Sequence, residues 1–193
     1  MPACRTAGSC LLPEQAAGVS VRAVEWTAIG GLAIVAAVGD VRTGRVPNAL
    51  TFGAAAVGFV FSVVHAGLGG LGPSILGYLV GFVLFLPLFA VRGMGAGDVK
   101  LLAAFGAWLG PAGALWAAIW ASLVGGVLAL AVGVWRGYLP EAIRNVAVIA
   151  GVWRAVGPSQ IPGVTLTDAR GPRLAYAVPI GIGAILALWL GAD

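Results

Sequence analysis

The chain has 193 residues, of which 60% are hydrophobic and only 9% carry a charged side chain. Soluble domains carry about 25% charged residues, so this composition excludes an ordinary soluble protein and indicates that lipid covers most of the surface. The formal net charge is +4 at pH 7, but the basic residues form no run or stripe of the kind that binds nucleic acid. Glycine contributes 31 residues, and small residues let helices approach closely in a bilayer. The composition therefore predicts a bundle of closely packed membrane helices.

The first segment, residues 1–21, contains no long apolar run and is expected to be a disordered tail. It also lacks the apolar core between a basic start and a cleavage site that marks a signal peptide. Both cysteines, Cys4 and Cys10, lie in this segment without a CxxC pair or a nearby histidine. They predict no metal site.

Six apolar segments follow the tail, and most approach the roughly 17 to 25 residues that span a bilayer. They comprise residues 23–39, 49–66, 71–91, 99–109, 113–135 and 173–191. The segment 99–109 is short for a crossing, and Gly110 with Pro111 predicts a break directly after it. The pattern predicts an all-α polytopic protein with six transmembrane helices.

The placement of basic residues sets the expected orientation, because lysine and arginine collect in short cytoplasmic connections. Nine of the eleven basic residues fall after the first, third and fifth segments. An outside N-terminus and six crossings put all of them in the cytoplasm, in the inner or plasma membrane. If residues 99–109 did not cross, the basic connection 136–172 would lie outside, so six crossings are favoured.

The connection 136–172 is the only long one, and its first part places apolar residues such as Ile143, Val146 and Trp153 at helical intervals. An interfacial helix is one interpretation, with Arg144 and Arg154 available to anionic headgroups. An ordinary amphipathic connector is the other, and the pattern does not choose between them.

Two of the seven acids stand beside apolar segments in connections expected on the cytoplasmic side, where an ionisable residue is costly and a functional candidate. Asp40 closes the first segment. Pro47 and Asn48 end the connection that follows, and Asn48 is expected to cap the next helix. Asp98 precedes the fourth segment, so the expected topology puts both acids at similar depth on the cytoplasmic side.

Glycines surround the second acid. Gly95 and Gly97 allow backbone dihedrals and close approaches that a side chain would prevent, so Asp98 is expected to lie against another helix. Each acid also has an ordinary structural explanation. Asp98 would serve as the N-cap of the following helix, and Asp40 would be a solvated loop acid balanced by Arg42.

A close pair of carboxylates has a chemistry of its own, because two such groups cannot both ionise cheaply and tend to share a proton. The ionised carboxylate draws a proton from water while the protonated one polarises a peptide carbonyl. This is the chemistry of an aspartic peptidase, which needs no metal, cofactor or covalent intermediate. Other sites are disfavoured: His65 is a lone histidine on the opposite side, and the string GAGDVK lacks the ending of a phosphate-binding loop.

With these residues in view, the sequence resembles the type IV prepilin peptidases of the GxGD family of aspartyl proteases. The resemblance covers about residues 23–191 and predicts one membrane domain, residues 22–193. Three segments carry it: DVRTGRVPNAL (40–50), GAGDVKLLAAFGAWLG (95–110) and RLAYAVPIGIGA (173–184). The third resembles the last-helix pattern of the short peptidases of Flp or Tad pilus systems.

The resemblance implies a membrane endopeptidase that binds the leader peptide and apolar helix of a prepilin or pseudopilin and cuts on the cytoplasmic side, after a leader-peptide glycine. It implies that Asp40 and Asp98 are the catalytic pair and that Gly95 and Gly97 shape the second site. Three further motif residues are supporting candidates: Lys100, Pro47 and Asn48. The N-terminal methyltransferase region and the tetracysteine zinc element of longer relatives are not in this sequence, so methylation is not expected.

Two other functions stay open at this point. A transporter or channel component would use the two acids to relay protons or bind a cation, although the second, third and fifth segments contain few polar residues. A catalytically silent relative in an assembly machine is the other alternative.

Overall fold

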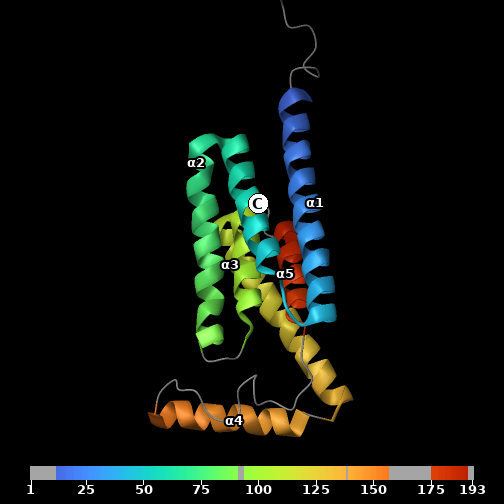
Figure 1. The fold of residues 1–193 in the computed structure, drawn as a ribbon, viewed down its shortest axis with the longest axis vertical. Helices are drawn as coiled ribbons and strands as arrows, with labels where there is room; N and C mark the ends of the chain where they lie inside the picture. The colour runs from blue at the N-terminus through green and yellow to red at the C-terminus, as the bar shows by residue number, and fades with distance from the viewer. Residues whose placement is uncertain (1–11, 91–93, 138, 157–174, 191–193) are drawn as a thin grey trace, which may run out of the picture.

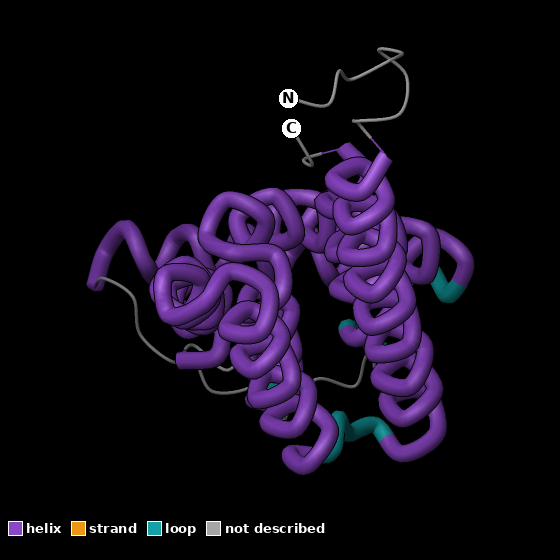
Figure 2. Tube along the Cα trace, turned by 90° about the horizontal axis from the view of Figure 1, so that it is seen from above, coloured by secondary structure: helices purple, strands orange, loops and turns teal. Residues whose placement is uncertain are grey.

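The structure is a computed structural model that describes residues 12–90, 94–137, 139–156 and 175–190. In these residues the regular elements are all helices, as the sequence predicts (Figures 1 and 2). They are α1 (Leu12–Thr43), α2 (Asn48–Ala90), α3 (Ala96–Trp135), α4 (Leu139–Val156) and α5 (Ala177–Leu190).

Helix α1 begins earlier than the sequence predicts. Residues 12–21, assigned above to a disordered tail, are helical, because this stretch contains the good helix formers Leu, Glu, Gln and Ala. Residues 1–11 lie outside the described part. The helix ends at a tight turn in which Gly44 adopts a positive φ of 63° and donates its N–H to the Asp40 carbonyl at 2.8 Å, a conformation that favours glycine.

The turn passes directly into α2. The Pro47 carbonyl accepts hydrogen bonds from the N–H groups of Leu50 and Thr51, at 3.1 and 3.3 Å. Pro47 thus holds the cap position, and Asn48 is the first residue of the helix. The expectation that Asn48 caps α2 is wrong for this reason, and its side chain is free for another contact.

Helix α2 doubles back on itself in Figure 1. Its backbone leaves the helical conformation at Gly67, where φ is 62°. The halves on either side pack together: the rings of Phe59 and Tyr78 are 5.8 Å apart, and the Ser62 hydroxyl donates to the Gly70 carbonyl at 2.7 Å. The two halves correspond to the predicted segments 49–66 and 71–91.

Helix α3 has a similar break at Gly110, where φ is 70°, which confirms the interruption predicted after residue 109. Its first half is the most buried part of the described chain, with Leu101, Leu102 and Phe105 fully buried. The Ser74 hydroxyl of α2 donates to the Ala107 carbonyl at 2.5 Å. Protein therefore surrounds this short segment.

Helix α5 lies between α1 and α3, and glycines make the close packing possible. A Cβ atom added at Gly181 would lie 2.9 Å from the Ala33 Cβ of α1, and one added at Gly183 would lie 2.6 Å from the Ala117 carbonyl of α3. Helix α5 therefore sets the position of α1 relative to α3.

Helix α4 lies across the end of the bundle at which α1 ends (Figure 1). Ile143 and Val146 are exposed on it. Among the described residues, three stretches are long and apolar enough to cross a membrane: Val21–Thr43, Asn48–Ala90 and Ala96–Trp135. Helix α5 is a shorter apolar helix.

Candidate active site

Asp40 lies near the end of α1 on its inward face. Ile29, Ala33 and Ala36 are buried at helical spacing along the same stripe, and Asp40 continues it as a half-buried residue. The backbone N–H of Ala177 donates to its Oδ2 atom at 3.1 Å. The first residue of α5 thus holds a carboxylate at the end of α1.

Asp98 lies in the first turn of α3 and is only 8% exposed. Gly95 occupies the N-cap position and makes no side-chain cap bond, and the Asp98 N–H donates to the Gly95 carbonyl at 3.2 Å. The ordinary explanation of Asp98 as an N-cap is therefore wrong, because the helix begins two residues before it. Its carboxylate, at the third helical position, accepts a hydrogen bond from the backbone of Gly95.

The structure brings the two aspartates to the same place. The negative charge of Asp40 acts electrostatically on Asp98, and the charge of Asp98 acts on the Tyr176 phenol. The three groups come from the end of α1, the start of α3 and the residue before α5. They meet at one end of the bundle, where Asp98 is buried and Asp40 and Tyr176 are half-buried.

Both glycines of the second motif lie where space is short. A Cβ atom added at Gly95 would lie 3.1 Å from Oδ2 of Asp98, and one added at Gly97 would lie 3.2 Å from the Cβ of Val46. Val46, which is buried, belongs to the turn after α1. The missing side chain of Gly95 therefore leaves room for the Asp98 carboxylate, and that of Gly97 lets the α1–α2 turn pack against the start of α3.

Lys100 lies two residues after Asp98, but its hydrogen bond goes to neither aspartate. Its ammonium donates to Oδ1 of Asn48 at 3.0 Å and lies 5.2 Å from the centre of the Phe52 ring. These contacts tie the first turn of α3 to the first turns of α2. Lys100 and Asn48 thus support the arrangement of helices around the site, and Pro47 starts α2 beside them.

Two residues at the site were missed as functional candidates. Tyr176 and Ala177 lie in the third segment of the family resemblance, residues 173–184, but no role was predicted for them. Nothing in residue spacing links position 177 to Asp40, since the hydrogen bond joins residues 137 positions apart. The nearest sequence signal is their place directly before the last apolar segment.

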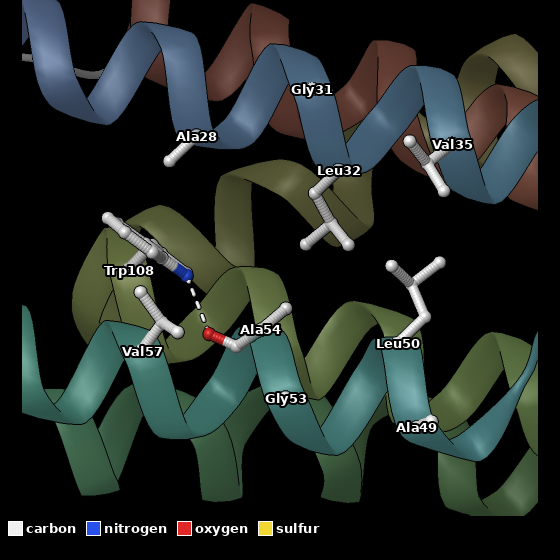
Figure 3. A pocket seen from close by; sticks show the side chains of 10 residues that line it. All are labelled: Ala28, Gly31, Leu32, Val35, Ala49, Leu50, Gly53, Ala54, Val57 and Trp108. Carbon is white, nitrogen blue, oxygen red and sulfur yellow. Dashed lines mark hydrogen bonds between the residues drawn. The ribbon is translucent and has the colours of Figure 1, made fainter.

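A separate apolar groove lies between α1 and the first half of α2 (Figure 3). Its volume is about 360 Å³. The Trp108 indole N–H donates to the Ala54 carbonyl at 2.9 Å and fixes the ring in the groove wall. The lining residues are Ala28, Gly31, Leu32, Val35, Ala49, Leu50, Gly53, Ala54, Val57 and Trp108. None of them ionises, so the groove is distinct from the aspartate site.

Comparison with known proteins finds a matching family and a similar protein. Residues 27–130, more than half of the chain, match the model of the type IV leader peptidase family. A protein of Xanthomonas campestris named prepilin leader peptidase/N-methyltransferase is 41% identical over 96 residues. The match covers 46% of this chain and 33% of that relative, so the chain spans about a third of the relative's length. No solved structure matches the chain. The matched family region contains both aspartates and both glycines of the site.

Proposed function

Since the chain belongs to the type IV leader peptidase family, we propose that it is a membrane aspartic endopeptidase that cuts the leader peptide from prepilin-like precursors, with Asp40 and Asp98 as its acid and base. One observation carries the proposal: two aspartates from different helices lie within electrostatic reach of each other, and one of them is almost fully buried. A buried charge is expensive to keep near a second one of the same sign. This cost is typical of residues that are kept for a function and not for stability.

The reaction follows from one ionised and one protonated carboxyl group. The ionised group takes a proton from water while the water oxygen bonds to the peptide carbonyl carbon, and the protonated group gives its proton to the carbonyl oxygen. The tetrahedral intermediate then collapses: the first group returns its proton to the amide nitrogen as the C–N bond breaks. The second group takes a hydroxyl proton from the intermediate, which restores the starting pair.

The rest of the site keeps the two carboxylates in place. The Ala177 N–H fixes one oxygen of Asp40, and the missing side chains of Gly95 and Gly97 leave room for Asp98 and for the turn after α1. The bond from Lys100 to Asn48 joins the starts of α3 and α2. Small displacements of reacting groups reduce rates strongly. These contacts therefore support the reaction by positioning the two carboxylates.

The helix breaks favour six membrane crossings. A crossing needs about 20 residues, whereas α2 has 43 residues and α3 has 40. Helix α2 breaks near its middle, at Gly67, and α3 breaks after about its first third, at Gly110. Each of these helices then crosses twice, and α1 and α5 cross once. Because basic residues favour the cytoplasm, the end with Arg42, Arg45 and Arg136 faces it, and the aspartates lie at that end.

Coexpression with a candidate prepilin tests the proposal. Asp40→Asn and Asp98→Asn should each abolish conversion of the precursor to its shorter mature form, because each removes one member of the acid–base pair. Glu25→Gln is the matched control, since Glu25 is another half-buried acid of α1 that lies away from the site, and processing should continue. Continued processing in both aspartate variants would refute the proposal.

A further inference from the structure

The start of α5 enters the aspartate site in a fixed position. Tyr176 accepts a hydrogen bond at its carbonyl from the Ile180 N–H at 3.1 Å, and the next residue, Ala177, donates to Asp40 at 3.1 Å. Ala177 is fully buried. The backbone of Tyr176 is therefore held on both sides, by the first turn of α5 and by the carboxylate of α1.

The Tyr176 side chain lies in the same place as the carboxylates. Its ring is half-buried and packs against the hydrophobic core. Burial, and next the charge of Asp98, raise the pKa of the Tyr176 phenol above its ordinary value. The phenol consequently keeps its proton throughout the neutral range and acts there as a hydrogen-bond donor.

The hydroxyl is also available. No described residue forms a hydrogen bond with it. The oxygen is not fully buried either, since no fully buried side-chain oxygen or nitrogen of the described residues lacks a partner. A donor within reach of the charge of Asp98, with no bond of its own in the described part of the chain, is suited to an oxygen that a substrate brings.

We propose that Tyr176 is a third functional side chain of this site: its phenol O–H donates a hydrogen bond to the carbonyl oxygen of the peptide bond that is cut. The inference rests on the function proposed above. During water addition this oxygen gains negative charge before and while it is protonated, and a fixed donor stabilises that charge. The phenol keeps its own proton, so the proton transfers remain between water, the two carboxylates and the substrate.

The test compares Tyr176→Phe with Tyr78→Phe. Each change removes one hydroxyl and keeps the ring. Tyr78 is the matched control because it is a half-buried tyrosine of α2 whose ring packs on Phe59, away from the aspartates. The full-length protein is purified in detergent, and kcat and KM are measured separately for cleavage of a purified prepilin.

Tyr176→Phe should lower kcat by roughly 100-fold, the usual effect of removing one donor to a developing oxyanion, with little change in KM. Tyr78→Phe should leave both values unchanged. The loss in Tyr176→Phe should also be constant between about pH 6 and pH 9, since the phenol of the unmodified protein stays protonated there. Thermal unfolding of both variants reports whether the fold is kept.

Equal kcat values in the two folded tyrosine variants would overturn the role of Tyr176. A higher KM with an unchanged kcat in Tyr176→Phe would overturn it too. That result would show that the hydroxyl binds the substrate and the transition state equally, without stabilising the transition state further. Asp98→Asn is measured alongside. If it is inactive while Tyr176→Phe is fully active, only this inference fails; if Asp98→Asn cleaves normally, the proposed function itself fails.

Discussion

The hydrogen bond from the Ala177 N–H to Asp40 can be removed without changing any side-chain functional group. Ala177→Pro deletes the donor, because proline has no N–H. Ala177 is the first residue of α5, the helix position at which proline is best tolerated. The substitution therefore removes one bond to a carboxylate and leaves the helix able to form.

The expected magnitude follows from the geometry. A hydrogen bond to a charged group contributes about 1.5 to 3 kcal/mol, and strong examples measure roughly 2.7 to 2.9 Å between nitrogen and oxygen. The bond here measures 3.1 Å and its acceptor Asp40 is half-buried, so the lower end of the range applies. About 1.5 kcal/mol corresponds to roughly a tenfold loss of kcat if the bond holds Asp40 in its reacting position.

The assay is prepilin cleavage by the purified protein, with Ala177→Gly as the control that keeps the N–H group. Ala177→Pro should cleave about tenfold more slowly than Ala177→Gly. Because Ala177 is fully buried, thermal unfolding of both variants shows whether the packing accepts the proline ring. In an Asp40→Asn background the two substitutions should no longer differ. Equal rates for folded Ala177→Pro and Ala177→Gly proteins would show that this bond does not position Asp40 for the reaction.

Three further predictions test the surroundings of the site. Gly97→Val should lower prepilin processing, because even a single Cβ atom would lie 3.2 Å from Val46 and would displace the turn after α1; Gly53→Val, where nothing lies within 4 Å of an added Cβ atom, should process normally. Lys100→Met should lower the free energy of unfolding by about 0.5 kcal/mol through loss of an exposed hydrogen bond, measured by denaturant titration in detergent. An unchanged value would show that the bond is not stabilising. Single cysteines at Gly44 and Gly67 should react with impermeant reagents from opposite sides of the membrane, with position 44 accessible from the cytoplasm; labelling of both from one side would contradict six crossings.

Local features of the sequence predicted most of the helical architecture. The apolar runs marked the helices, and Gly110 with Pro111 marked the break in α3, because a positive φ and a missing N–H are properties of those residues themselves. The failures were local too. Residues 12–21 form helix where a tail was expected, and Pro47 took the capping role assigned to Asn48, since composition does not show which of two adjacent residues a helix begins with.

The sequence by itself also singled out Asp40 and Asp98, because an acid next to an apolar helix is costly wherever the chain then folds. Only the tertiary structure decided what surrounds them. Helix α5 packs between α1 and α3 through close contacts at Gly181 and Gly183, and this packing brings Ala177 to Asp40 and Tyr176 within reach of the charge of Asp98. Those relations join residues far apart in the chain through the shapes of three helices, and no spacing along a single sequence encodes them.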